Sequence, residues 1–459
     1  MSQAKNTILL MLLIVSSGGA VVGATREPAA PAGSKQTSGA AQESGRNAQP
    51  GMSLSVNSSS KPVATPLAQL IEEAERHNPR ILAARRAWQA AEQVPSQVST
   101  LPDPQVVVQQ LNVGSPRPFA GFTNNNFAYL GLGVSQDLPY PGKLRLKGEM
   151  AKRDAAVSRD GTVSTSRAVV EQLREVYFNL GYNEQILAIL HRDQELLANV
   201  EKVAEARYRV GEGNEQDVLK AQLEQSKLLE ELALRRQQIG ALEASLKLLL
   251  NRPMDSPDIT AEAPVETLLP YTADELMASV RGSNPAVDAG QQIVRREELQ
   301  VELAHKDFYP DFNVQYMVQR TGLQFPAYYM LTFGVKIPIY RRRKQGPELA
   351  ESVENMNRSR RLYEAQLQSA YFQVRDQYLA AETGAQVLKI YRQGLLPQAA
   401  ATFQAGLAAY SANREDFETL LSSFLDVLHL DEEYWRALAK HEIALAKIEQ
   451  ITGMSLQSR

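Results

Sequence analysis

Two long stretches of the chain carry apolar residues at the spacing of a helix. In one of them the apolar positions are alternately four and three residues apart, which is the pattern of a coiled-coil seam. Its members are Leu228, Leu232, Arg235, Ile239, Leu242, Leu246 and Leu249, with Arg235 as the one polar residue. The preceding stretch has a similar stripe, formed by Leu173, Val176, Leu180, Leu187, Leu190, Leu197 and Val200. Because no proline occurs between Pro141 and Gly211, this stretch predicts a helix of up to roughly 100 Å.

Four other segments alternate between apolar and polar residues with a period of two, which predicts strands. The alternation is clearest from Phe312 to Val318 and from Tyr329 to Ile339. The predicted strands cover residues 105–113, 127–138, 311–319 and 328–339, and they pair as two hairpins. Each has about 9 to 12 residues, the length that a tilted strand needs to cross a membrane.

The same order of features occurs twice along the chain. Matching landmarks are Asn78-Pro79 with Asn284-Pro285, Pro139 with Pro338, Asn214 with Asn413, and Asp217 with Asp416. The last three pairs share an offset of 199 residues. We therefore predict two internal repeats, 66–265 and 266–455, followed by a short tail at 456–459. Each repeat would hold a helix, two strands and a long antiparallel pair of helices.

The N-terminal segment has the composition of a targeting signal. Lys5 precedes an apolar run from Ile8 to Val15, and Val22-Gly23-Ala24 supplies the small residues of a cleavage site. We predict a signal peptide over 1–24, with a membrane anchor as the alternative. Residues 25–65 are rich in Ala, Ser, Gly, Gln and Pro, which predicts a disordered leader or a tether to another part of the envelope.

Composition excludes several classes of function. The chain has 49 Lys and Arg against 52 Asp and Glu and no Cys among its 459 residues. This charge balance argues against a nucleic-acid partner, and the lack of Cys excludes disulfides and thiolate chemistry. The five His residues lack the spacing of a metal site, and no catalytic motif is present. We therefore predict a protein that is not an enzyme and holds no cofactor.

Four amphipathic strands cannot form a closed membrane barrel, because the smallest barrels have about eight strands and an open sheet edge is not tolerated in lipid. If these strands cross a membrane, several chains must share one barrel. The long helices would then extend from one end of that barrel, with the Gly-, Asn- and Asp-rich turns at their far ends.

The residues that carry these features resemble a known family. The order of PDP (102–104), LPYPGK, a long helix ending in ARYRVGEGNEQDVLKAQ, and a second, weaker copy is similar to the TolC-like outer-membrane efflux proteins. LPYPGK is most similar to the branch that serves heavy-metal resistance-nodulation-division pumps. The resemblance covers about Leu67 to Gly453.

The resemblance implies a mainly α fold with a membrane β-barrel portion. A homotrimer would share a 12-stranded barrel in outer-membrane lipid and continue as an α-helical tunnel across the periplasm. Its partners would be a periplasmic adaptor and an inner-membrane pump, and its substrates metal ions or drugs. Two alternatives remain open from the sequence: a type I secretion outlet with the same fold, and a soluble periplasmic coiled-coil scaffold.

The resemblance also assigns the candidate site to the two turns at the helix ends. It implies that Asp416 and Asp217 line the aperture, with Arg414 and Glu415 as latch candidates. Gly211, Gly213, Asn214 and Asn413 are the implied adaptor contacts. The alternative is structural: each Asp caps a helix, the glycines permit positive φ, and Arg414 and Glu415 are solvated.

A basic run, Arg341 to Lys344, follows the last predicted strand. Its side chains either reach lipid head groups at a membrane boundary or belong to a solvated helix start.

Overall fold

The computed structural model describes residues 64–112, 128–321, 326–412 and 414–456, all within one compact unit, Ser60–Arg459. The predicted signal peptide, nearly all of the predicted leader, most of both loops between paired strands, and Asn413 lie outside the described residues.

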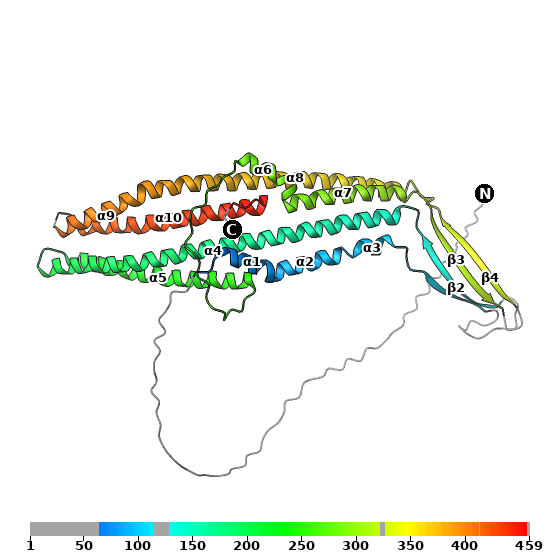
Figure 1. Ribbon diagram of the computed structural model, residues 1–459, viewed down its shortest axis with the longest axis horizontal. Coiled ribbons are helices and arrows are strands. Elements are labelled where there is room, and N and C mark those ends of the chain that lie inside the picture. Colours follow the sequence, from blue (N-terminus) through cyan, green and yellow to red (C-terminus); the bar gives the residue numbers. More distant parts are fainter. Residues whose placement is uncertain (1–63, 113–127, 322–325, 413, 457–459) are drawn as a thin grey trace, which may run out of the picture. The chain divides into compact units, whose positions relative to one another are not determined.

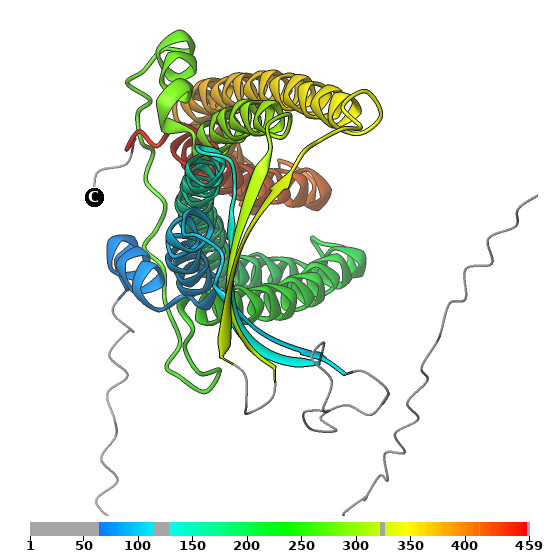
Figure 2. The ribbon, with the colours of Figure 1, turned by 90° about the vertical axis from the view of Figure 1, so that its right-hand side faces the viewer.

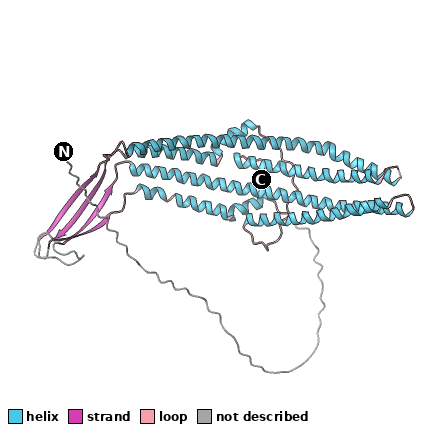
Figure 3. Ribbon diagram, turned by 180° about the vertical axis from the view of Figure 1, so that it is seen from behind, coloured by secondary structure: helices cyan, strands magenta, loops and turns pink. Residues whose placement is uncertain are grey.

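Helices dominate the described residues, and one four-stranded sheet lies at the end where α3 and α7 lead into strands (Figures 1 and 3). The helical elements are α1 (Leu67–His77), α2 (Pro79–Ala91), α3 (Val94–Ser99), α4 (Lys143–Arg209), α5 (Glu215–Leu250), α6 (Ala273–Ser283), α7 (Pro285–Lys306), α8 (Gln345–Ile390), η1 (Tyr391–Leu395), α9 (Leu396–Ser411) and α10 (Phe417–Thr452). The strands are β1 (Gln105–Leu111), β2 (Tyr129–Leu138), β3 (Asp311–Arg320) and β4 (Ala327–Lys336).

Helix α4 is the long helix that the sequence predicts. It has 67 residues, which corresponds to about 100 Å. Helices α1, α2, α3, α5, α7 and α10 all pack against it, and Figure 2 shows the helices grouped around it in end view. Five members of its predicted stripe are buried: Leu173, Leu180, Leu190, Leu197 and Val200. The heptad pattern therefore marks the true core face of α4.

Arg235, the polar member of the predicted seam on α5, is buried and ties three helices together. Its guanidinium lies 2.6 Å from Glu432 on α10 and 2.7 Å from Glu231 on α5. It also donates to Tyr182 and Asn183 on α4, each at 3.2 Å. A buried cation needs several partners to offset its lost hydration, and this arrangement supplies them.

The second long helix contains an irregularity that the sequence analysis did not predict. Residues 345–411 are helical without a break and match α4 in length, but Tyr391–Leu395 form a π-helical turn. Pro397 follows this turn and has no N–H to donate to the preceding turn. The wider π turn, closed by the bond from Leu396 N–H to the Tyr391 carbonyl, keeps the helix continuous at this proline.

The four strands form one antiparallel sheet in the order β1-β2-β3-β4. The register aligns apolar side chains in rows across one face, such as Val106, Val134, Tyr316 and Leu331 in one row, and Val108, Leu132, Val318 and Tyr329 in the next. Polar side chains fill rows on the other face, for example Gln105, Ser135, Gln315 and Thr332. The sheet is thus amphipathic, and its apolar face is exposed, with Val106 at 72% and Phe333 at 71%.

The predicted bounds of three strands need correction. β1 ends at Leu111 rather than at residue 113. β2 begins at Tyr129 rather than at residue 127, and β4 ends at Lys336 rather than at residue 339. Pro338 cannot donate to a ladder, and the Ile339 N–H turns back to the Ile337 carbonyl at 3.0 Å, so the chain leaves the sheet there.

A buried lysine joins the sheet to the helices. Lys143, in the first turn of α4, lies 2.9 Å from Asp307, just after α7, and 2.9 Å from Asp311, at the start of β3. The Asp311 carboxylate also accepts the Tyr140 N–H at 2.8 Å. The segment that follows β2 and the segment that leads into β3 are thereby held beside each other.

Asn78 and Asn284 are buried and play the same part in the two halves. The side-chain oxygen of each accepts two N–H groups at the start of the following helix, α2 or α7. The Asn78 amide donates to the Leu249 carbonyl at 2.7 Å, and the Asn284 amide donates to the Ile451 carbonyl at 3.0 Å. Each Asn-Pro therefore begins a helix, α2 or α7. A further helix, α1 or α6, precedes it, so the prediction of a single helix before each hairpin is wrong.

The segment between α5 and α6 lies along α4, where Glu184 holds it. The Glu184 carboxylate accepts the Ala261 N–H at 3.1 Å, and the Tyr177 hydroxyl accepts the Glu262 N–H at 2.9 Å. Burial raises the pKa of Glu184 to about 7; the Ala261 N–H bond opposes this rise and the charge of Glu243 adds to it.

We expect Glu184→Gln to stabilise the protein at alkaline pH. The folded state holds the Glu184 proton up to a pKa of about 7, against an ordinary value of 4.5, so the free energy of unfolding falls as pH rises between these values. Thermal unfolding followed by circular dichroism should show a midpoint about 1–2 °C higher than wild type at pH 8, and no difference at pH 4.5. The exposed Glu195→Gln serves as the control, and an equal gain at both pH values would contradict this account.

Candidate functional site: the two helix-end turns

The turn between α4 and α5 is closed by a Schellman motif. The Glu212 N–H donates to the Arg207 carbonyl at 2.9 Å, and the Gly211 N–H donates to the Tyr208 carbonyl at 3.0 Å. Gly211 has φ of +81°, the left-handed conformation that this motif requires. The predicted conformational role of Gly211 is therefore confirmed.

Gly213 has a different role from the one predicted, because its φ is not positive. A Cβ at this position would lie 3.1 Å from the Arg207 Cβ and 3.1 Å from the Tyr208 nitrogen. Glycine is favoured here because the turn folds back closely onto the end of α4. The prediction of positive φ at Gly213 is wrong, and the constraint is one of space.

The turn between α9 and α10 closes in the same way, with the Arg414 N–H donating to the Ala409 carbonyl at 2.9 Å. Asp416 is the N-cap of α10, and its carboxylate accepts the Thr419 N–H at 2.8 Å. This bond holds the pKa of Asp416 below its usual range, which favours the charged form of this exposed carboxylate. The structural alternative for Asp416, helix capping, is confirmed.

Asp217 does not cap its helix. Asn214 is the N-cap of α5 and makes no side-chain capping bond, while Asp217 lies in the first turn, where a negative charge suits the helix dipole. The helices α5 and α10 both have 36 residues and begin 202 residues apart. Asp416 and Asn214 are therefore equivalent N-cap positions. The offset of 199 residues instead pairs Asp416 with Asp217, which lies three residues after the N-cap of α5.

Arg207 and Tyr410 connect the two turns. The Arg207 guanidinium donates to the Tyr410 carbonyl at 2.8 Å and lies 4.3 Å from the centre of the Tyr410 ring. Tyr410 is 1% exposed; its burial raises the pKa of its hydroxyl, and the charge of Asp217 adds to the rise. A second, more exposed link is the ion pair of Lys220 with Glu418 at 2.6 Å.

These contacts enclose a polar pocket of about 530 Å³ between the turns. Its lining includes Gly213, Asn214, Asp217, Arg414, Glu415 and Asp416, so most of the predicted site residues come together. The predicted residue Gly211 is not part of the lining, and Asn413 lies outside the described residues. Five carboxylates line the pocket against three basic side chains, which gives it a negative potential that favours cations.

The contact between Arg207 and Tyr410 was not predicted from the sequence. Arg207 stands within ARYRVGEGNEQD, four residues before Gly211, at the end of the long helix. A basic residue in the last turn of a helix is ordinary, because it suits the helix dipole. Its partner is 203 residues away, so no local pattern indicates that these two side chains meet.

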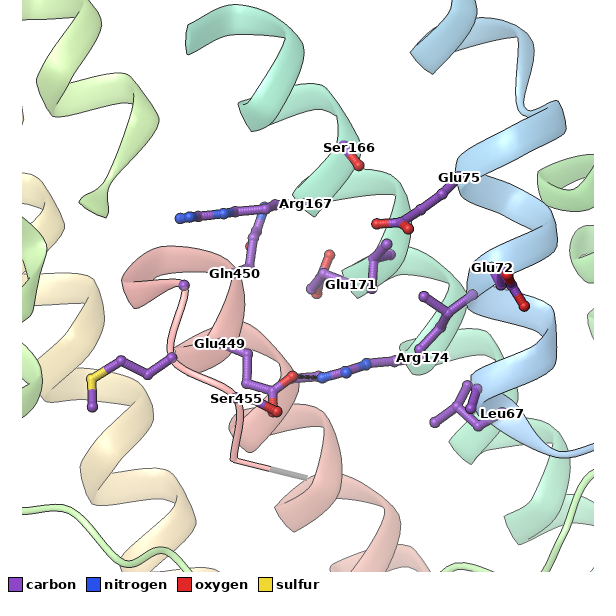
Figure 4. Close-up of a pocket in the computed structure, with 16 residues that line it drawn as sticks. Leu67, Glu72, Glu75, Ser166, Arg167, Glu171, Arg174, Glu449, Gln450 and Ser455 are labelled. Carbon is purple, nitrogen blue, oxygen red and sulfur yellow. Dashed lines mark ion pairs between the residues drawn. The ribbon is translucent and has the colours of Figure 1, made fainter. Parts of the chain in front are cut away.

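A second cleft, of about 610 Å³, lies between α1, α4 and the end of α10 and contains no predicted site residue. Figure 4 shows the ion pair of Arg174 with Glu449 across it. Glu171 faces the same cleft, and its burial raises the pKa of its carboxyl, with the charge of Glu175 adding to the rise.

Metal and membrane-helix features are not found in the described part of the chain. There, no group of three or more His, Asp and Glu side chains is placed to hold a metal ion. Likewise, none of the described helices has a stretch that is long and apolar enough to cross a membrane.

The chain belongs to the outer membrane efflux protein family. The family model matches residues 70–252 and 276–419, which cover both turns, all four strands and most of the long helices. This agrees with the family that the sequence motifs resemble, whose members are conduits rather than enzymes. The protein is therefore an outer-membrane protein of the Gram-negative envelope, and the alternative of a soluble periplasmic scaffold is excluded.

Solved structures share the fold. The outer-membrane channel OprN is 16% identical, with a TM-score of 0.73 over 85% of this chain and 91% of its own. VceC from Vibrio cholerae is 17% identical, with a TM-score of 0.72 over 85% and 97%. The open state of MtrE from Neisseria gonorrhoeae is 17% identical, with a TM-score of 0.71 over 85% and 89%. No curated protein matches the chain.

We expect Arg207→Ala to loosen both turns. The substitution removes the bond to the Tyr410 carbonyl and the contact with the Tyr410 ring, whereas Lys220→Ala removes an exposed ion pair worth little. Amide hydrogen exchange followed by mass spectrometry should rise at least about tenfold at residues 207–213 and 409–412 in Arg207→Ala, which corresponds to the loss of about 1.4 kcal/mol. Lys220→Ala should exchange as the wild type does. Equal exchange in all three proteins would show that Arg207 does not hold the turns together.

Proposed function

We propose that the protein is the outer-membrane channel of a tripartite efflux system. Three chains form a passive conduit from the periplasm to the exterior, and an inner-membrane pump and a periplasmic adaptor complete the system. The observation that carries this proposal is the sheet with one apolar and one polar face, joined directly to helices of about 100 Å.

The sheet supports a shared barrel. In a single chain β1 and β4 are edge strands, and an unpaired edge is not tolerated in lipid. Three copies joined edge to edge give 12 strands, with the apolar rows toward lipid and the polar rows toward the lumen. Strands of 10 residues, such as β2, β3 and β4, have the length for a tilted crossing.

The helices support a tunnel. A closed helical wall needs apolar surface on each chain for the next chain to cover, and the described helices offer it. Exposed apolar side chains on α5 and α8 are Leu219, Leu223, Leu229, Leu234 and Leu248, and Leu362, Phe372, Leu379 and Ile390. The internal duplication then places two similar helix pairs per chain around the tunnel axis.

The turns support a gate and an adaptor contact at the periplasmic end. Asp416 is charged and exposed, and three copies around an axis form a ring of carboxylates that attracts cations and resists closure by mutual repulsion. Asp217, Arg414 and Glu415 line the same pocket and tune its charge. Gly211, Gly213, Asn214 and Asn413 form the surface on which the adaptor docks.

The shared barrel predicts a trimer that requires detergent. Light scattering on the full chain extracted from outer membranes should give a protein mass of three chains, about 150 kDa for a chain of 50.8 kDa. A monomer or dimer that stays soluble without detergent would overturn the channel proposal.

Two substitutions separate the effect of the Asp416 charge at the aperture from its effect as a helix cap. Asp416→Asn removes the charge but keeps an oxygen that accepts the Thr419 N–H, whereas Asp416→Ala removes both. In planar bilayers both variants should lower the ratio of cation to anion permeability several-fold, because the ring loses its charge. Asp217→Asn tests the second carboxylate. Wild-type selectivity in Asp416→Asn would remove Asp416 from the conduction path.

A further inference from the structure

A turn of four consecutive basic residues leads from β4 into α8. Arg341, Arg342, Arg343 and Lys344, which we call the basic turn, are all exposed. Three backbone bonds fix it: the Arg343 and Lys344 N–H groups donate to the Tyr340 carbonyl, each at 2.9 Å, and the Gly346 N–H donates to the Arg341 carbonyl at 2.7 Å. The four charges are thus held close together by the fold.

Among the described residues, no carboxylate forms an ion pair with any of the four side chains of the basic turn. The α8 helix begins directly after Lys344, so the positive end of its dipole adds to the potential. In the first half, by contrast, Lys143 is neutralised by Asp307 and Asp311. The basic turn therefore presents an uncompensated positive surface.

Exposed apolar side chains border the basic turn on the side of the sheet. Ile337 is 62% exposed, Ile339 72% and Tyr340 67%, and they directly follow β4 in the chain. An apolar and aromatic band followed at once by arginines and a lysine has the order of a membrane boundary, where hydrocarbon gives way to head groups.

We propose that the basic turn binds the phosphate groups of anionic phospholipids in the periplasmic leaflet of the outer membrane. This inference rests on the proposed barrel and assigns a ligand to the periplasmic rim of that barrel. Guanidinium groups bind phosphate oxygens in pairs of hydrogen bonds, and the apolar residues beside them enter the acyl layer. Each chain contributes four such cations, and bound lipid fastens the junction between the sheet and α8.

The test compares two variants of the full chain purified in detergent. The first neutralises the basic turn, with Arg341→Gln, Arg342→Gln, Arg343→Gln and Lys344→Gln. The control removes the same charge from helices near the far turns, with Lys202→Gln, Arg209→Gln, Lys227→Gln and Arg236→Gln. Native mass spectrometry measures bound phosphatidylglycerol and phosphatidylcholine. We expect the wild type and the control to prefer phosphatidylglycerol by at least about tenfold, and the first variant to lose that preference.

Three outcomes would overturn the proposal. They are an unchanged preference in the first variant, an equal loss in the control, and displacement of phosphatidylglycerol by millimolar inorganic phosphate, which would indicate a site for small anions. Single-channel recordings separate this test from the proposed function. A first variant that conducts normally but has lost lipid preference supports both inferences, and one that binds lipid normally refutes only the lipid site.

Discussion

The structure depends on the uninterrupted burial of one face of α4. In proteins most of the stability of a helix comes from packing of its apolar face, so neighbours must cover the apolar stripe of this 67-residue helix along its length. The helices α5, α7 and α10 do so in turn, and the short helices α1 to α3 cover the remainder. Because α4 begins beside the sheet and ends at a turn, its length also sets the distance between the two functional ends of the chain.

Buried polar groups fix where these helices stop and how they align. Apolar stripes with a regular spacing allow neighbouring helices to slide by a turn, whereas a buried charge or amide is satisfied in one alignment only. Arg235 between α4, α5 and α10, and the paired Asn78 and Asn284 at the helix ends, are contacts of this kind. Together they define the register of the bundle at its middle and near its end.

At the turns, one group can serve both structure and transport. Asp416 caps α10, and the hydrogen bond that stabilises the cap also lowers the pKa of its carboxyl. This shift opposes the mutual repulsion of three carboxylates in the proposed ring, which would raise their pKa. The Arg207 contact with Tyr410 then holds the two turns together, so that the carboxylates of both line one pocket.

Much of the fold follows from local pattern, whereas the family resemblance pointed to the pocket residues Asp217 and Asp416. Period-two alternation located all four strands, and β3 was predicted to within one residue at its end. Heptad spacing located the core face of α4 and α5. These features depend on neighbours within a few residues, which the sequence displays directly.

What the sequence could not give depends on partners far apart in the chain. Arg207 contacts Tyr410, and Arg235 contacts Glu432. The partners are about two hundred residues apart in the sequence, and no local pattern predicts either contact. The need for glycine at position 213 arises from a close approach of the backbone, and the π turn before Pro397 arises because the helix must remain continuous. The sequence by itself thus determined the elements and the chemistry of the turns. Only tertiary packing decided which side chains meet, because burial and partner geometry exist only once the helices lie side by side.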